Sequence, residues 1–196
     1  MPAPRKRRHS QKDRALDLYQ TAPEAVWALL RHETLPHTLW DASCGPGNIV
    51  RILRANGHDV LATDIKDYAS PHQDLAGIEW DFLQLQQPPC MIEAIIQNPP
   101  YYVADEFVEH SLELVPKAYF LLRLAWLESM ARLPFFKRGM LRRVLVFSNR
   151  LPMQHRDGWT GKRSSNTTAF AWFVFDREYR GLPEVRWIVW RESDNR

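Results

Sequence analysis

Residues 39–53 read LWDASCGPGNIVRIL, and this short stretch decides the fold. An apolar run ends at Asp41, two glycines follow at Gly45 and Gly47, and apolar residues then recur at helical spacing. Glycine lets the backbone turn tightly and lets a ligand approach it closely. A strand, a glycine loop and a helix in this order are typical of nucleotide sites at the carboxyl ends of parallel strands. A plain strand-to-helix turn is the alternative.

The spacing within this loop narrows the class of nucleotide. A dinucleotide fingerprint needs a third glycine three residues after Gly47, where this chain has Val50. No lysine followed by serine or threonine completes a triphosphate loop. The loop therefore disfavours a nicotinamide oxidoreductase and favours a nucleoside without a phosphate chain.

Two further acids end predicted strands. Asp64 ends the strand predicted within 58–65, where a carboxylate can accept two hydrogen bonds from a ribose diol. Asp81 ends a weaker strand predicted within 77–84, where it could accept from an adenine amino group with Phe82 beside the ring. Each acid alone is more often a cap or a solvated residue. Together with the acid that ends the first strand, they predict a nucleoside pocket.

Strands and helices alternate between residue 21 and about residue 135. Helices are predicted at 21–33, with Thr21 as its cap, at 47–57 and at 105–115. Such alternation indicates right-handed crossovers and a parallel sheet that is covered on both faces. Two late strands, at 169–176 and 185–190, have no helix between them, so they predict an antiparallel edge. The first of the two reads as a core strand buried on both faces.

The formal net charge of +3 hides a strong asymmetry along the chain. Residues 1–14 carry +5, residues 132–163 carry +8 and the remainder carries −10. We expect residues 1–14 to be a disordered basic tail and residues 15–196 to form one domain. A stretch of +8 with interleaved aromatics favours contact with a polyanion over a merely solvated surface.

Several classes of protein are disfavoured by what the sequence lacks. Cys44 and Cys90 are too few for a disulfide framework, and the seven histidines show no metal-ligand spacing. No apolar run is long enough to span a membrane, and no apolar segment follows the basic N-terminus as in a secretory signal. We therefore expect a cytoplasmic protein with no metal and no membrane contact.

Four motifs taken together resemble one family. They are DASCGPG at 41–47, ATDI at 62–65, DFL at 81–83 and NPPY at 98–101. In this order they resemble the class I S-adenosylmethionine-dependent methyltransferases, and NPPY narrows the resemblance to the amino-methyltransferases, most closely the DNA adenine-N6 enzymes. The segment DLYQTAPEAVWALL at 17–30 is similar to the stretch these enzymes often carry before the glycine loop. The resemblance covers residues 17–125.

The resemblance implies a Rossmann-like, mostly parallel, seven-stranded sheet and S-adenosylmethionine as cofactor. It implies that the glycine loop lies under the methionine part of the cofactor, with Asp41 orienting its amino end. The implied cofactor-binding residues are Tyr19, Thr21, Asp41, Ser43, Cys44, Gly45, Gly47, Asp64, Ile65, Asp81, Phe82 and Asn98. The implied catalytic residues are Asn98, Pro99, Pro100 and Tyr101.

The Asn-Pro-Pro-Tyr corner suits methylation of an exocyclic amine. Such an amine is a poor nucleophile, because its lone pair is delocalised into the ring. The Asn98 side-chain oxygen and the Pro99 carbonyl could accept hydrogen bonds from its two N–H groups and stabilise the charge that develops on nitrogen. Prolines fix φ, so this carbonyl is aimed in advance. Tyr101 could stack on the acceptor base. If that base belonged to a duplex, it would first have to be flipped out of the helix. A strand terminator with a capping asparagine is the alternative.

The loop at 150–168 is a possible substrate-binding loop, with a mobile surface loop as the alternative. Its candidate nucleic-acid-binding residues are Arg150, Arg156, Lys162 and Arg163, which could contact phosphates, and Trp159, which could stack on a base. No large recognition domain lies between the glycine loop and Asn98, and about 70 residues follow Arg123, so we expect a recognition domain to be missing or reduced to a loop. This expectation disfavours sequence-specific recognition of a duplex.

Adenine N6 in DNA is the leading acceptor, and DNA is favoured over RNA. An RNA base, cytosine N4, a protein glutamine and a non-catalytic nucleic-acid-binding module remain alternatives.

Overall fold

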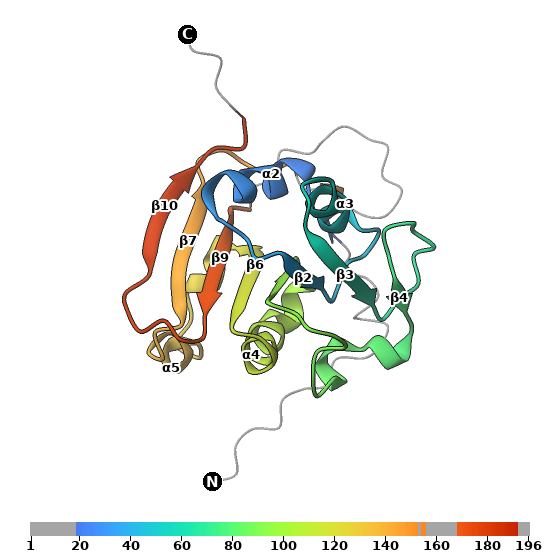
Figure 1. Cartoon of the computed structure of the whole chain (residues 1–196). Coiled ribbons are helices and arrows are strands. Elements are labelled where there is room, and N and C mark those ends of the chain that lie inside the picture. The colour runs from blue at the N-terminus through green and yellow to red at the C-terminus, as the bar shows by residue number, and fades with distance from the viewer. Residues whose placement is uncertain (1–18, 153, 156–167, 192–196) are drawn as a thin grey trace.

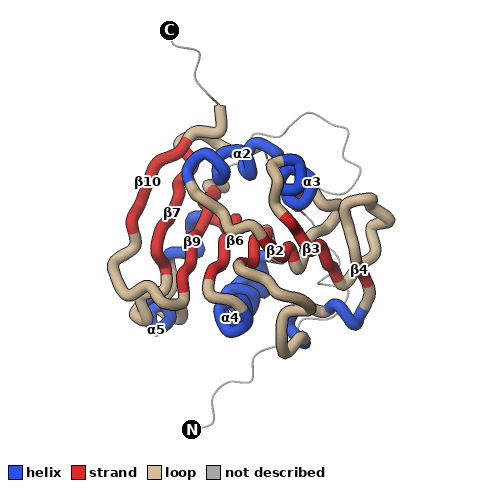
Figure 2. Tube along the Cα trace, in the orientation of Figure 1, coloured by secondary structure: helices blue, strands red, loops and turns tan. Residues whose placement is uncertain are grey.

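The structure is a computed structural model that describes residues 19–152, 154, 155 and 168–191 (Figure 1). The predicted basic tail at 1–14 lies outside these residues. The described chain forms a central mixed sheet with helices on both faces (Figures 1 and 2). The α/β class predicted from the alternation of strands and helices is therefore confirmed.

The main sheet has eight strands within the described residues. Their order is β10-β7-β9-β6-β5-β2-β3-β4. The strands are β2 (Thr38–Asp41), β3 (Asp59–Asp64), β4 (Leu75–Ala76), β5 (Ala94–Gln97), β6 (Lys117–Arg123), β7 (Leu141–Phe147), β9 (Phe170–Asp176) and β10 (Glu184–Ile188). A separate antiparallel pair joins β1 (Tyr19–Gln20) to β8 (Gln154–His155).

The helices form one layer on each face of the sheet. Helices α2 (Pro23–His32) and α3 (Asn48–Ala55) pack into one core cluster, while α4 (Ala104–Leu114) and α5 (Leu133–Phe136) pack into the other. Figure 1 shows the two pairs on opposite sides of the strands. Short 3₁₀ turns are η1 (Ile78–Trp80), η2 (Phe82–Gln84), η3 (Tyr101–Val103) and η4 (Leu124–Leu127).

The predicted antiparallel edge is wrong in its position. Strand β9 lies inside the sheet, antiparallel to both β6 and β7, and the edge strand β10 runs parallel to β7. The six leading residues of β9 are all buried, as its unbroken apolar sequence predicts. A strand buried on both faces is stabilised most when it is also paired on both edges, which accounts for its interior place.

The weak strand predicted within 77–84 is also absent. Strand β4 is only two residues long, and the chain then forms the turns η1 and η2 on either side of Asp81. Of these turn residues only Phe82 is buried, while Ile78 is 62% exposed. The stretch therefore lacks the regular burial that holds a strand against a core, although it still delivers Asp81 and Phe82 to the same end of the sheet.

Two absences concern the described residues. No helix in the described ranges is long and apolar enough to cross a membrane. Over the same part of the chain, no group of three histidine, cysteine or acidic side chains is placed to hold a metal ion.

Candidate functional site

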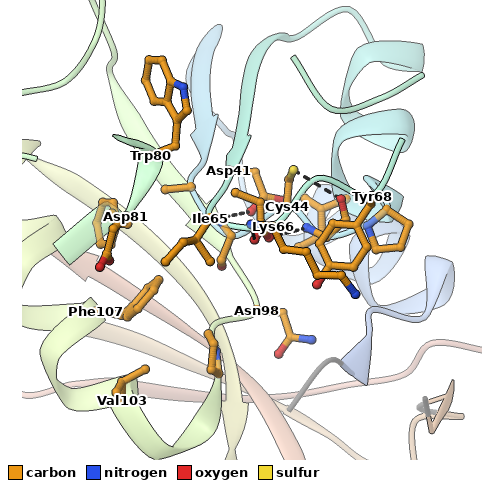
Figure 3. Close-up of a pocket in the computed structure, with 18 of the residues that line it drawn as sticks. Asp41, Cys44, Ile65, Lys66, Tyr68, Trp80, Asp81, Asn98, Val103 and Phe107 are labelled. Atoms are coloured by element: carbon orange, nitrogen blue, oxygen red, sulfur yellow. Dashed lines mark hydrogen bonds between the residues drawn. The ribbon is translucent and has the colours of Figure 1, made fainter. Parts of the chain in front are cut away.

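A cavity of about 510 Å³ lies at the carboxyl ends of β2, β3 and β5 (Figure 3). Most of the predicted cofactor-binding residues line it: Thr21, Asp41, Ser43, Cys44, Gly45, Asp64, Ile65, Asp81, Phe82 and Asn98. Pro100 lines it too, while Gly47, Pro99 and Tyr101 lie outside its wall. Tyr19 lies in β1, one residue before Gln20, which is part of the wall. Residues far apart in the sequence are thus brought to one cavity.

The glycine loop has the backbone that its sequence predicts. Gly45 and Gly47 have φ values of 54° and 87°, in the left-handed region that favours glycine. A Cβ at Gly47 would lie 2.4 Å from the Cβ of His72, so a side chain has no room there. The second glycine therefore serves close packing against the loop that follows β3, and the first lies at the cavity.

Asp64 ties the glycine loop to β3. Its Oδ2 accepts a hydrogen bond from the Gly45 N–H (3.0 Å), and its Oδ1 accepts one from the Lys66 N–H (2.9 Å). Burial raises the pKa of Asp64 despite these bonds. Each carboxylate oxygen has more than one acceptor site, so a carboxylate held in this way could still accept from a ligand's hydroxyls.

Asp41 is the most unusual group in the wall. Its side chain is 1% exposed, and its Oδ2 has no hydrogen-bond partner among the described residues. Burial raises the pKa of Asp41 well above its usual value, and the nearby Asp64 adds to the rise. A buried carboxylate oxygen without a partner is costly. A ligand that places an ammonium group beside it would relieve that cost.

Cys44 is a wall residue without nucleophilic character. Burial is the main cause that raises the pKa of its thiol, and the charges of Asp41 and Asp64 raise it further. A reactive cysteine needs a lowered pKa and a positive environment. Cys44 therefore contributes shape and an apolar surface to the cavity.

The far end of the cavity is aromatic. Phe82 packs edge-on to Trp40 at 5.4 Å between ring centroids and lies 4.9 Å from Phe107. The sequence analysis missed several residues of this wall, including Lys66, Tyr68, Ile78, Trp80, Val103 and Phe107. Lys66 and Tyr68 follow Asp64 closely, so their position after a predicted strand end was a usable signal. No pattern in the sequence indicated that Trp80 or Phe107 would line the cavity.

Asn98 follows β5 directly, and its amide orientation is set by a neighbour. Its Nδ2 donates to the Thr21 hydroxyl (3.1 Å), so Oδ1 is the end turned away from Thr21. Thr21 is 5% exposed, and its carbonyl accepts from the Asn48 side chain (3.1 Å). The predicted capping role of Thr21 is wrong, because Ala22 is the N-cap of α2. Its hydroxyl contacts the corner instead.

A buried glutamine joins this corner to the glycine loop. Gln97 is fully buried at the end of β5 and accepts from the Ser43 hydroxyl (3.0 Å). Its Nε2 donates to the Ser111 hydroxyl (3.3 Å) on α4. These bonds fix the distance between the loop of β2 and the corner of β5, which are adjacent strands.

Tyr101 is turned toward the core cluster that contains Phe170, whose ring centroid lies 5.8 Å away. The guanidinium of Arg123 lies over the Tyr101 ring, 4.6 Å from its centroid. Arg123 is the last residue of β6, the strand beside β5. The predicted stacking face of Tyr101 is thus covered by a cation that the sequence analysis did not identify.

The described residues of the basic stretch at 132–163 differ in their partners. Its leading part is paired with acids, in the ion pairs Arg132–Asp105, Arg138–Glu109, Arg142–Asp176, Arg143–Glu33 and Arg143–Glu184. Arg142 and Arg143 begin β7, at the end of the strand away from the cavity. Arg150 follows the other end of β7, and Arg156, Trp159, Lys162 and Arg163 lie outside the described residues.

Comparison with known proteins gives likeness in structure only. No family model matches the chain, and no curated protein matches its sequence. A candidate RNA methyltransferase from Pyrococcus horikoshii superposes with a TM-score of 0.58 and 13% identity, over 82% of this chain and 88% of that one. The modification subunit of a candidate type I restriction enzyme from Vibrio vulnificus gives 0.60 and 11%, over 91% of this chain and 48% of that one.

A third structure, the 23S rRNA methyltransferase ErmE, gives a TM-score of 0.52 and 17% identity, over 83% of this chain and 70% of that one. Identities this low compare folds and leave activity open. The chain has the Rossmann-like fold of the class I methyltransferases.

Proposed function

We propose that this chain transfers a methyl group from S-adenosylmethionine to an exocyclic amine of a nucleic-acid base, with adenine N6 in DNA as the leading acceptor. One observation carries the proposal. The Asp41 Oδ2, a buried carboxylate oxygen with no hydrogen-bond partner among the described residues, lies in the wall of the same cavity as Asn98 and Pro100 of the Asn-Pro-Pro-Tyr corner. The first suits an amino-acid ligand, and the second suits an amine acceptor.

We assign each part of S-adenosylmethionine to residues of the cavity wall. Asp41 would take the ammonium group, Asp64 would take the ribose hydroxyls, and Asp81 with Phe82 would hold the adenine. The glycine loop has Val50 where a dinucleotide site needs a third glycine for its phosphates. S-adenosylmethionine has no phosphate chain, so it does not need that glycine. When bound, S-adenosylmethionine supplies an electrophilic methyl group on a positively charged sulfur.

The corner would activate the acceptor amine. The Asn98 Oδ1 and the Pro99 carbonyl would accept hydrogen bonds from its two N–H groups, which pyramidalises the nitrogen and withdraws its lone pair from conjugation with the ring. As the nitrogen–carbon bond forms and the carbon–sulfur bond breaks, both oxygens stabilise the charge on nitrogen, and one proton then leaves to water. Thr21 orients the Asn98 amide for this task. Fixed geometry can lower the barrier by several kcal/mol.

Nucleic acid is the acceptor class that the surroundings favour. The named activities of two similar structures concern RNA, and a third belongs to a restriction enzyme. Arg150 lies at the same end of the sheet as the corner, and we propose it as a phosphate contact together with Arg156, Lys162 and Arg163, with Trp159 stacking on a base. RNA is the second candidate acceptor, because two of the three similar structures described above are named as RNA methyltransferases.

A labelled-methyl assay tests the proposal. The protein is incubated with labelled S-adenosylmethionine and, in parallel, with unmethylated DNA, RNA and cell protein, and the modified nucleosides are identified by mass spectrometry. We expect label in DNA as N6-methyladenine. Label in RNA alone would move the proposal to the second candidate, and label confined to protein would overturn it.

A further inference from the structure

Arg123 is an exposed cation beside the proposed acceptor corner, and no step proposed so far uses it. It ends β6, whose residue Phe120 pairs with Gln97 of β5. The two strands are parallel, so the three residues that follow Phe120 run beside the corner that follows Gln97. The sheet register therefore brings this cation to the level of the Asn-Pro-Pro-Tyr corner.

Among the described residues, the guanidinium of Arg123 interacts with the ring of Tyr101. It lies over the Tyr101 ring, and neither Arg123 nor Arg150 has an acidic partner among the residues that the structure describes. The arginines at the other end of β7 are paired with acids, as Arg142 is with Asp176. Arg123, which ends β6, and Arg150, which follows β7, thus lie at the end of the sheet that carries the corner.

We propose that Arg123 binds the phosphate of the acceptor nucleotide, and that in the free protein its guanidinium covers the Tyr101 face on which the acceptor base stacks. The inference rests on the proposed nucleic-acid function and names a contact within it. A guanidinium is planar and weakly hydrated, so it stacks on an aromatic ring and also binds phosphate with two parallel hydrogen bonds.

The exchange between the two positions is favourable in direction. Stacking on a tyrosine ring stabilises a base by more free energy than it stabilises a solvent-exposed guanidinium. An entering base therefore displaces Arg123 from the ring. The displaced guanidinium remains tethered to the end of β6, within the span of its own side chain from the corner. It then meets the phosphate that the base carries with it. A protein acceptor would bring no phosphate to this position.

The test measures binding without requiring transfer. A fluorescent single-stranded 12-mer, as DNA and as RNA, is titrated with the protein in saturating S-adenosylhomocysteine at several salt concentrations. The variants are Arg123→Met, which keeps an apolar cover on Tyr101, and Arg123→Lys, which keeps the charge. Arg142→Met is the matched control, because it removes an arginine from the opposite end of β7.

We expect Arg123→Met to weaken oligonucleotide binding by roughly tenfold and to reduce the magnitude of the salt slope by about 0.7, the value for one phosphate contact on a single strand. Arg123→Lys should keep the slope and lose only part of the affinity. Arg142→Met should match the wild type. The dissociation constant of S-adenosylhomocysteine should be the same in all variants, which a general structural defect would not allow.

Three results would overturn the inference. They are an unchanged affinity and slope in Arg123→Met, an equal loss in Arg142→Met, and a loss that appears with an acidic peptide and not with the oligonucleotide. If the wild type binds no oligonucleotide, the proposed function itself fails and the inference falls with it. If the wild type binds and Arg123→Met is unchanged, only the role of Arg123 fails.

Discussion

The two halves of the candidate site differ in how completely the protein has assembled them. On the side of β2 and β3, Asp64 accepts hydrogen bonds from the Gly45 N–H of the glycine loop and from the Lys66 N–H after β3, and Asp41 is buried at the wall. On the side of β6, the Tyr101 ring is covered by the exposed Arg123. The first half is ready for its ligand, while the second must exchange one contact for another. We therefore expect cofactor binding to be independent of the acceptor.

The largest expected effect separates the two halves at Asn98. Replacing Asn98 with alanine removes one of two acceptors for the reacting amine, so kcat should fall by roughly 10²–10³-fold. The affinity for S-adenosylhomocysteine, measured by calorimetry, should change by less than about threefold, which is below the roughly tenfold change expected from losing a hydrogen bond worth about 1.4 kcal/mol. An equal loss of both would show that Asn98 only supports the fold.

The next effect concerns the cofactor half. Asp41→Asn should weaken S-adenosylhomocysteine roughly 10- to 100-fold, the usual worth of a hydrogen bond to a charged group. Methylthioadenosine, which lacks the amino-acid part, is the matched ligand and should bind the variant as well as the wild type. If both ligands weaken equally, Asp41 does not contact the ammonium group.

Much of the cofactor half could be predicted because its signals are local in sequence. Asp41, Gly45 and Asp64 lie at strand ends that can be read from short apolar runs, and the structure places all three at the cavity. The contact between Thr21 and Asn98 joins residues 77 positions apart, and no pattern in either segment indicates it. The cover on Tyr101 depends likewise on the register of β5 and β6.

The basic stretch teaches the same lesson about charge. Its net charge favoured contact with a polyanion, yet Arg132 and Arg143 pair with acids from other parts of the chain, Asp105 and Glu33. The position of β9 between β6 and β7 also could not be predicted from the sequence, because strand pairing depends on how all the elements pack in the core. Local patterns predict elements, and tertiary contacts decide which of their charges remain unpaired.

The Thr21 hydroxyl offers a way to sharpen the difference between the halves. Thr21→Val keeps the shape and removes the acceptor that orients the Asn98 amide, so kcat should fall about tenfold, the worth of one neutral hydrogen bond. Thr21→Ser should restore most of the rate. The pair is compared under saturating cofactor and acceptor. A rise in KM for the cofactor, with kcat unchanged, would place Thr21 in the cofactor half alone.

The buried acids also predict how stability depends on pH. Burial raises the pKa of Asp41 and of Asp64 in the folded state, so the folded protein holds protons that the unfolded chain releases above about pH 4. The free energy of unfolding of the cofactor-free protein should therefore fall as pH rises from about 4 through the folded pKa values. Urea unfolding at several pH values measures this, and Asp41→Asn should flatten the curve. Because the lowered pKa values of Glu93 and Glu184 act in the opposite direction in both proteins, the comparison with the variant is decisive: an equal pH dependence in the wild type and in Asp41→Asn would contradict the assignment.

The smallest expected effect on binding lies at the paired arginines. Arg132 bonds to Asp105 and to two backbone carbonyls, so Arg132→Met should cost about 1–2 kcal/mol of stability. Its affinity for a single-stranded oligonucleotide and the salt slope should equal those of the wild type. A loss of affinity in this variant, at a temperature where it is fully folded, would show that Arg132 contacts the oligonucleotide despite its ion pair.

One measurement tests the central claim most directly. Two single-stranded oligonucleotide pools with random flanks carry either adenine or hypoxanthine at the centre, and differ only in whether that base has an exocyclic amine. Both are incubated with labelled S-adenosylmethionine, and the central nucleoside is analysed by mass spectrometry. The account predicts methyl on the central adenine, none on hypoxanthine, and none on either with Asn98→Ala. Equal methylation of the two central bases would contradict it.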